Sequence, residues 1–230
     1  MCRGSNTISR SPTMNGMSGF GPGRWKLGRG IEEHYNLSDA LAVAFYLNVF
    51  IRQCRTVGMA SFAQMVNATA PIFTNPEGLF RQTIFHPLKL YSDHLQGPAL
   101  DIHVDSPTYN LTAENETSPI PHRVADLSPF TMLDATATLS DSGKVVAIGV
   151  VNRDRDNDHE TVIDLVSERS ISRVSAYEVA GNDPDIKNSF EEPDNVDVVS
   201  RDVPTESEAT QISYSFPRHS VTVLRIELAN

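Results

Sequence analysis

Beyond Gly97 the sequence changes from a helical period to a period of two. Turn signals such as Asp141-Ser142-Gly143 and Gly181-Asn182-Asp183-Pro184 separate short segments rich in β-branched residues. Seven segments have this character: ALDIHVDS, TMLDATATLS, KVVAIGVVNR, ETVIDLVS, SRVSAYEV, TQISYSF and SVTVLRIEL. Strands of this length and spacing predict an antiparallel β-sandwich over residues 97–230.

Residues 31–96 have a different pattern, which begins with a helix. Asn36 or Ser38 can cap a helix over Leu37 to Cys54, whose apolar positions recur at three- and four-residue spacing and leave it apolar on most sides. A strand over Val57 to Gln64 follows it. Helix and strand are therefore expected to pack inside a larger fold.

The next part of this region predicts a turn and a second helix. Thr74 to Gly78 is rich in turn residues, and Leu79 to His94 has a helical period that Pro87 should kink or shorten. The order helix, strand, loop, helix is typical of an α/β fold. The fold class predicted for the chain is thus α/β plus all-β.

Residues 1–30 are rich in Ser, Gly, Pro and Arg and contain neither Asp nor Glu. We predict a disordered leader there. It lacks the apolar core of a secretory signal, and no apolar run in the chain approaches the ~18 residues of a membrane span. We expect no membrane insertion, and the sequence leaves the cellular location unknown.

Charge and spacing exclude several kinds of site. Nineteen basic and 29 acidic residues give a net charge of −10, which argues against binding to nucleic acid or anionic lipid. The seven histidines have no metal spacing, and no phosphate-binding loop occurs. Asp154 to Glu160 has the alternating acids of a calcium loop but lacks its central glycine, so we predict a solvated hairpin tip. We expect neither a metal nor another cofactor.

The stretch FAQMVNATAPI, residues 62–72, places Gln64 and Asn67 in an otherwise apolar context. A buried amide without partners costs about 1–3 kcal/mol. Either neighbouring backbone satisfies these side chains, or the strand ends at a cavity where a ligand does.

Four long motifs carry a family resemblance. EEHYNLSDALAVAFYLNVFIR, SFAQMVNATAPIFTNPEGLFRQTIFHPLKLYS, LDIHVDSPTY and VAIGVVNR together resemble the C-terminal part of the family-51 glycoside hydrolases, the α-L-arabinofuranosidases. The likeness covers residues 31–230, and the stretch PEGLFRQT is most similar to the fungal branch.

The resemblance implies a (β/α)8 catalytic barrel followed by a jelly-roll-like β-sandwich. Residues 31–96 would be the terminal helix-strand-helix segment of the barrel, and residues 97–230 the sandwich. The family releases terminal arabinofuranosyl groups from arabinan, arabinoxylan or arabinogalactan with retention, so an arabinose-containing polysaccharide or oligosaccharide is the implied partner, and an oligomer is possible. Gln64 would contact the arabinose ring at the barrel mouth. The alternative is that Gln64 caps backbone, while Asn67 orders the following loop.

The resemblance also shows what this sequence lacks. Retaining hydrolysis needs two carboxyl groups about 5 Å apart. In the family, the acid/base follows an asparagine after the fourth strand, and the nucleophile lies in a Glu-Trp-Asn-Val-Trp type of motif upstream of the position that matches Glu32. The acid-free leader occupies that place here. We therefore assign no catalytic residue and expect the chain to be inactive by itself.

Two further expectations concern the chain as a molecule. Residues 37–64 would be buried in a complete barrel, so an exposed apolar patch and two unfolding transitions are expected.

The rival interpretation is a non-catalytic β-sandwich that binds or supports other molecules. Its sugar platforms would be Tyr177, Tyr214 and Phe216, because the single tryptophan, Trp25, lies in the leader.

Overall fold

The computed structural model describes residues 32–111, 127–206 and 208–229, so the predicted leader lies outside the described residues. Two helices are described, α1 (Leu37–Arg52) and α2 (Phe85–His94). The described strands are β1 (Ile72–Asn75), β2 (Gly78–Arg81), β3 (Ala99–Leu100), β4 (Thr108–Tyr109), β5 (Phe130–Thr131), β6 (Leu133–Leu139), β7 (Val145–Asn152), β8 (His159–Asp164), β9 (Ile171–Val179), β10 (Val199–Val203), β11 (Gln211–Phe216) and β12 (Ser220–Leu228).

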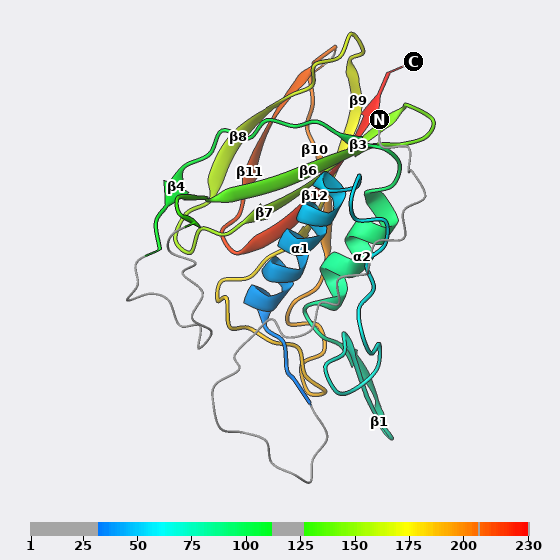
Figure 1. Cartoon of the computed structure of the whole chain (residues 1–230), viewed down its shortest axis with the longest axis vertical. Coiled ribbons are helices and arrows are strands. Elements are labelled where there is room, and N and C mark those ends of the chain that lie inside the picture. The colour runs from blue at the N-terminus through cyan, green and yellow to red at the C-terminus, as the bar shows by residue number, and fades with distance from the viewer. Residues whose placement is uncertain (1–31, 112–126, 207, 230) are drawn as a thin grey trace.

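A six-stranded antiparallel sheet in the order β10-β9-β12-β7-β6-β3 organises the molecule (Figure 1). Each of the seven predicted segments contains a strand, which confirms the antiparallel all-β region. β10 was not predicted, because its sequence VSRDV is mostly exposed and lacks an apolar alternation.

The antiparallel pair β8–β11 covers one face of the large sheet. β11 alternates strictly between exposed and buried positions, and its buried Ile212, Tyr214 and Phe216 pack against β6, β7, β9 and β12. This packing of two sheets forms the core of the sandwich.

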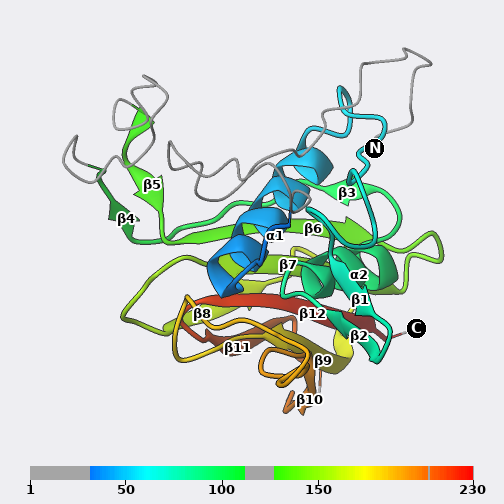
Figure 2. The same cartoon turned by 90° about the horizontal axis from the view of Figure 1, so that it is seen from below.

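The two helices cover the opposite face of the same sheet (Figure 2). Leu37, Ala40 and Ala44 of α1 share one apolar cluster with α2 and with β7, β9 and β12. β7 is therefore covered on both faces, and seven of its eight residues are buried. This coverage explains why VVAIGVVN is apolar at nearly every position.

A polar network fixes the helices on the sheet. Asn48 of α1 is fully buried, accepts a hydrogen bond from the Tyr91 hydroxyl at 2.6 Å, and donates to the Asp134 carboxylate at 2.8 Å. Arg52 binds the same carboxylate at 2.9 Å and also donates to the Ala135 carbonyl at 2.6 Å. The network joins α1, α2 and β6, and each buried polar group in it has a hydrogen-bond partner.

The strand predicted over Val57 to Gln64 is wrong for this structure. These residues form no strand, contain only an isolated bridge at Ser61, and are followed by exposed Met65 and Val66. A strand needs neighbouring backbone to satisfy its N–H and C=O groups. None of the described strands pairs with this segment.

The second helix is shorter than predicted. Leu79 to Arg81 belongs to the hairpin β1–β2, with the predicted turn at Asn75 to Gly78, and α2 begins at Phe85. Pro87 lies in the first turn of α2, where its missing N–H removes no intrahelical hydrogen bond. Pro87 therefore fits the first turn of α2 without bending it, and the helix is shorter than predicted because Leu79 to Arg81 pairs with β1.

Candidate functional site

The loop that carries Gln64 lies against the segment that precedes α1. We call residues 33–36 and 64–71 together the rim. The backbone N–H of Glu33 donates to the carbonyl of Ala68 at 3.2 Å. The Tyr35 hydroxyl donates to Glu33 Oε2 at 3.0 Å and lies 3.3 Å from the Thr69 carbonyl. Burial, followed by the Glu33 carboxylate, raises the pKa of Tyr35, so its hydroxyl stays a donor at neutral pH.

Gln64 is an exposed residue of the rim with a left-handed backbone, φ 63°. Asn67 and Ala68 share this conformation, at φ 57° and 53°. A residue with a Cβ atom pays about 1–2 kcal/mol there. Within the described ranges nothing hydrogen-bonds the Gln64 amide, so this structure shows no backbone cap made by Gln64. Its donors and acceptor are free to meet a ligand.

Asn67 orders the loop, as predicted. Its Oδ1 accepts from the Thr74 N–H at 2.8 Å, its Nδ2 donates to Thr74 Oγ1 at 3.2 Å, and its own N–H donates to the Ile72 carbonyl at 2.8 Å. The amide therefore ties the rim to β1.

The deeply buried amide of this region is Gln82, which the sequence analysis did not single out. Its side chain is 1% exposed and makes three hydrogen bonds. Oε1 accepts from the Tyr35 N–H at 2.8 Å, and Nε2 donates to the Glu33 carbonyl at 3.0 Å and to the Ala70 carbonyl at 2.6 Å. Its position, directly after the end of β2, gave no pattern that distinguishes it from an exposed glutamine.

A row of rings connects the rim to the hairpin β1–β2. The exposed His34 ring stacks on Phe73 at 5.1 Å, Phe73 stacks on Phe80 at 5.6 Å, and Phe80 meets Phe190 edge-on at 4.8 Å. This row links the segment before α1, the hairpin β1–β2 and the loop after β9. The rim is thus built on a packed base.

Comparisons with known proteins decide the family. Residues 18–220 match the family model described as "Alpha-L-arabinofuranosidase C-terminal domain". The chain belongs to this family. The resemblance inferred from the four sequence motifs is therefore confirmed.

Similar proteins include two fungal arabinofuranosidases. The "Probable alpha-L-arabinofuranosidase C" of Aspergillus flavus is 39% identical over 200 residues, which cover 86% of this chain and 36% of that protein. The "Alpha-L-arabinofuranosidase C" of Emericella nidulans is 37% identical over 197 residues, with the same coverage. The chain thus spans a little over a third of the length of these relatives.

A solved structure supports the same conclusion about the fold. The α-L-arabinofuranosidase of Thermotoga maritima, determined as an arabinose complex, superposes with a TM-score of 0.73 at 26% sequence identity. The match covers 86% of this chain and 40% of that one. The antiparallel β-architecture described above is therefore that of the C-terminal region of arabinofuranosidases.

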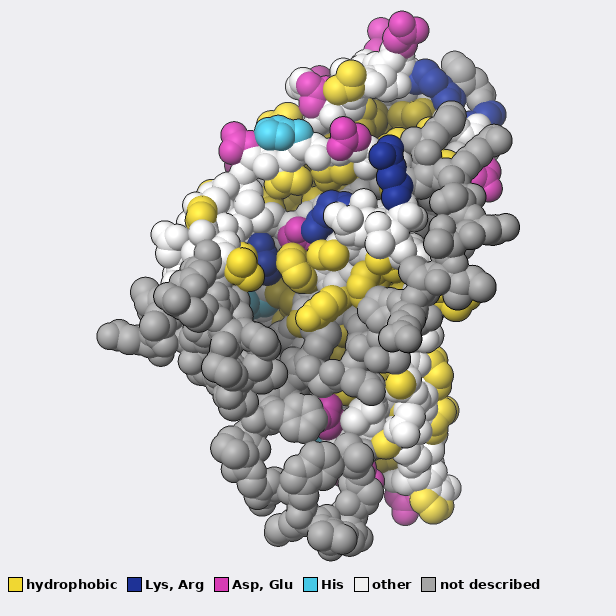
Figure 3. Space-filling view, in the orientation of Figure 1, with side chains coloured by type: hydrophobic (Ala, Val, Ile, Leu, Met, Phe, Trp, Pro, Cys, Tyr) yellow, Lys and Arg dark blue, Asp and Glu magenta, His cyan; other side chains and the backbone are white. Residues whose placement is uncertain are grey.

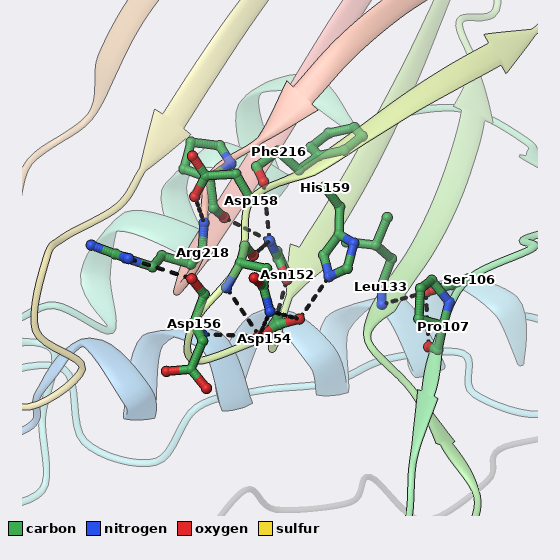
Figure 4. Close-up of polar contacts among 12 residues, drawn as sticks. Ser106, Pro107, Leu133, Asn152, Asp154, Asp156, Asp158, His159, Phe216 and Arg218 are labelled. Atoms are coloured by element: carbon green, nitrogen blue, oxygen red, sulfur yellow. Dashed lines mark hydrogen bonds and ion pairs between the residues drawn. The ribbon is translucent and has the colours of Figure 1, made fainter.

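The acidic stretch after β7, residues 154–160, forms a hydrogen-bonded turn, which we call the corner (Figure 4). Asp154 is buried rather than solvated, which corrects part of the predicted hairpin tip. It accepts hydrogen bonds from the N–H groups of Asp156 and Asn157 and contacts His159 Nε2 at 2.9 Å. Burial by itself raises the pKa of Asp154, but these hydrogen bonds outweigh it and hold the pKa below its ordinary value.

Asn152 completes this corner. Its Nδ2 donates to the carbonyls of Asn157, Phe216 and Pro217, and its Oδ1 accepts from the Asp154 N–H. The carboxylate of Asp154 is thus occupied by backbone N–H groups and by the side chains of Asn157 and His159. Over the described ranges, no group of three His, Cys, Asp or Glu side chains is arranged to hold a metal ion.

Of the three rings proposed as sugar platforms, two are buried and the third is stacked on a histidine. Tyr214 and Phe216 are 5% and 1% exposed and lie in the core of the sandwich. Tyr177 stacks on His94 with ring centroids 4.1 Å apart. The structure therefore gives no support to the rival interpretation as a stand-alone sugar-binding module.

No helix of the described part is long and apolar enough to cross a membrane.

Proposed function

We propose that this chain is the C-terminal part of a retaining α-L-arabinofuranosidase. In this proposal the rim presents Gln64 to a terminal arabinofuranosyl group of arabinan, arabinoxylan or arabinogalactan, and the rest of the active site comes from other polypeptide. The observation that carries the proposal is the rim itself: an exposed, unpartnered glutamine on a strained loop that a buried amide and an aromatic row hold in place. Strained backbone of this kind is common at ligand sites.

The carboxyl groups of this chain support inactivity of the chain by itself. A general acid needs a raised pKa. Hydrogen bonds hold the pKa of Asp154 low despite its burial, backbone and Ser189 hydrogen bonds lower the pKa of Glu191, and Arg173 lowers that of Asp202. None of these three carboxyl groups therefore has the raised pKa that a general acid needs.

The half-buried Asp134 and the buried Glu178 are also committed to structural partners. Asp134 binds Arg52, and Glu178 accepts from Tyr214 at 2.9 Å and from Arg201 at 3.1 Å. A nucleophile must be free to attack the anomeric carbon. These side chains stabilise the sandwich instead.

The proposal assigns residues 31–96 to the end of a catalytic barrel and residues 97–230 to the sandwich that carries it. Segment 57–64, which holds only an isolated bridge at Ser61, would become a strand when barrel strands from other polypeptide supply its backbone partners. Exposed apolar side chains of this segment and its neighbourhood, such as Met59 at 72% and Met65 at 54%, would then be covered.

Reconstitution tests this proposal. The chain would be co-expressed with the N-terminal two thirds of the Aspergillus flavus relative, and hydrolysis of an aryl α-L-arabinofuranoside would be measured. We expect turnover only when both polypeptides are present, and a loss of about ten- to a hundredfold in kcat/KM for Gln64→Ala, because a contact to the reacting sugar is removed. A stable complex without activity would contradict the proposal.

A further inference from the structure

Gln82 connects the two segments of the rim through one side chain. Its Oε1 holds the N–H of Tyr35, while its Nε2 holds the carbonyls of Glu33 and Ala70. Its own backbone N–H donates to the Pro71 carbonyl at 2.8 Å. Four backbone groups of the rim are therefore satisfied by one residue at the end of β2.

We propose that Gln82 is a positioning residue, a buried amide clamp that sets the conformation of the loop carrying Gln64. Gln82 fixes the end of this loop at Ala70 and Pro71, and Asn67 fixes its middle to β1. Gln64 lies three residues before Asn67, so its left-handed backbone depends on both anchors. The meaning of this position for catalysis rests on the proposed function, but the clamp can be measured without it.

The chemistry of the clamp requires an amide. The side chain must accept one hydrogen bond and donate two, and it is almost completely buried. A carboxylate would keep the acceptor for Tyr35 but would face two carbonyl oxygens. A thioether would keep the volume but satisfy none of the three backbone groups, which is the costly outcome for buried polar groups.

This requirement gives a test that is independent of hydrolysis. Gln82→Glu and Gln82→Met would be made in the full chain, and amide hydrogen exchange would be followed by NMR at pH 5 and pH 7.5. Glu33, Tyr35 and Asn67 report on the rim, because their N–H groups make the hydrogen bonds described above. Amides of β7 report on the whole fold.

For Gln82→Met we expect protection of the three rim amides to fall about tenfold or more at both pH values, with β7 amides unchanged. For Gln82→Glu at pH 7.5 we expect the same loss at the Glu33 and Asn67 amides but a smaller one at Tyr35, because the carboxylate keeps its acceptor. We expect a partial recovery at pH 5, since a protonated carboxyl group can again donate to one carbonyl. A purely volume-filling residue would not produce this pH dependence. The variant Thr83→Val is the matched control, because it removes the neighbouring hydrogen bond from Thr83 Oγ1 to the Asn36 carbonyl without touching the clamp.

Three outcomes would overturn the inference: unchanged rim protection in Gln82→Met, equal loss of protection in β7 and the rim, or a loss in Gln82→Glu that does not respond to pH. If Gln82→Met does not fold, Gln82→Glu prepared at pH 5 and shifted to pH 7.5 gives the same decision. Failure of reconstitution with normal clamp behaviour would count against the proposed function alone.

Discussion

At the residue scale, Gly149 of β7 leaves the space that Tyr91 occupies. A Cβ atom there would lie 2.8 Å from the Tyr91 hydroxyl and 3.1 Å from Leu95 Cδ2. Tyr91 cannot move freely, because its hydroxyl donates to the buried Asn48. We expect Gly149→Ala to lower the free energy of unfolding by about 1–3 kcal/mol, as overpacking does.

Urea denaturation measures this change. Gly58→Ala is the control, since a Cβ atom there meets nothing within 4 Å, and we expect a change within about 0.5 kcal/mol. Equal effects of the two substitutions would show that Tyr91 and Leu95 do not pack closely against Gly149 of β7.

His86 makes stability depend on pH. Burial lowers the pKa of His86 below its ordinary value of 6.5 and outweighs the opposing Asp197, whose carboxylate lies 3.5 Å from Nδ1. The unfolded chain therefore binds the proton more readily than the folded one. Stability is fully present above pH 6.5 and falls as the pH drops through 6.5 toward the folded pKa.

Urea midpoints between pH 5 and pH 8 test this sign. We expect the His86→Gln variant to show a shallower decline below pH 6.5 than the parent. Burial also lowers the pKa of His94, so a smaller decline in the same direction remains. A decline as steep as that of the parent would contradict the assignment to His86.

It was hard to predict from the sequence which polar side chain of this region is buried. The sequence indicated that the side-chain amides of Gln64 and Asn67 need hydrogen-bond partners. Asn67 does order its loop. The buried amide that holds the rim together is instead Gln82, 18 positions beyond Gln64. Nothing local in PEGLFRQT distinguishes Gln82 from a surface residue, because its partners Glu33 and Tyr35 are distant in sequence.

At the element scale, the sequence predicts the start of α1. Asn36 accepts from the Asp39 N–H at 3.0 Å, and Asp39 accepts from the Asn36 N–H at 2.9 Å, which is a capping box. We expect Asn36→Ala to cost about 1 kcal/mol of stability and Asn36→Ser to cost less, as thermal unfolding followed by circular dichroism would show. Equal losses would mean that the cap contributes little and that contacts to the loop at Asp185 dominate.

The elements that the sequence predicted well are those whose pattern reports their own environment. β11 alternates because one face is buried, and β7 is continuously apolar because the sandwich and the helices cover both faces. The segment 57–64 was mispredicted because strand formation depends on partners that the pattern does not contain. The start of α2 was misplaced because Leu79 to Arg81 pairs with β1, a contact that the helical period did not reveal.

At the scale of the whole molecule, the helices and the sandwich share one apolar cluster. α1 and α2 contribute to the same core as β7, β9 and β12, and the network from Tyr91 to Asp134 crosses the predicted boundary at residues 96 and 97. This shared core changes the expectation of two unfolding transitions. We now expect one transition, with helical and near-ultraviolet circular dichroism signals that coincide. Two separated transitions would show that residues 31–96 unfold independently.

Apolar side chains remain exposed in the described part of the chain, and Figure 3 shows yellow apolar atoms on one face of the molecule. Met59, Met65 and Val66 are all more than half exposed. Exposed apolar surface of this kind favours association with other polypeptide. We expect the native chain to bind a hydrophobic dye and to bind less of it in the reconstituted complex, as fluorescence titration would measure; equal dye binding in both states would contradict coverage of this segment.

We propose that this arabinofuranosidase C-terminal region does not hydrolyse glycosides by itself. The most direct measurement is the hydrolysis of an aryl α-L-arabinofuranoside by the purified chain, with circular dichroism to establish that it is folded. We expect a folded protein with no turnover above background. Turnover by the folded chain would contradict it, and would mean that carboxyl groups within residues 32–229 assemble a catalytic pair.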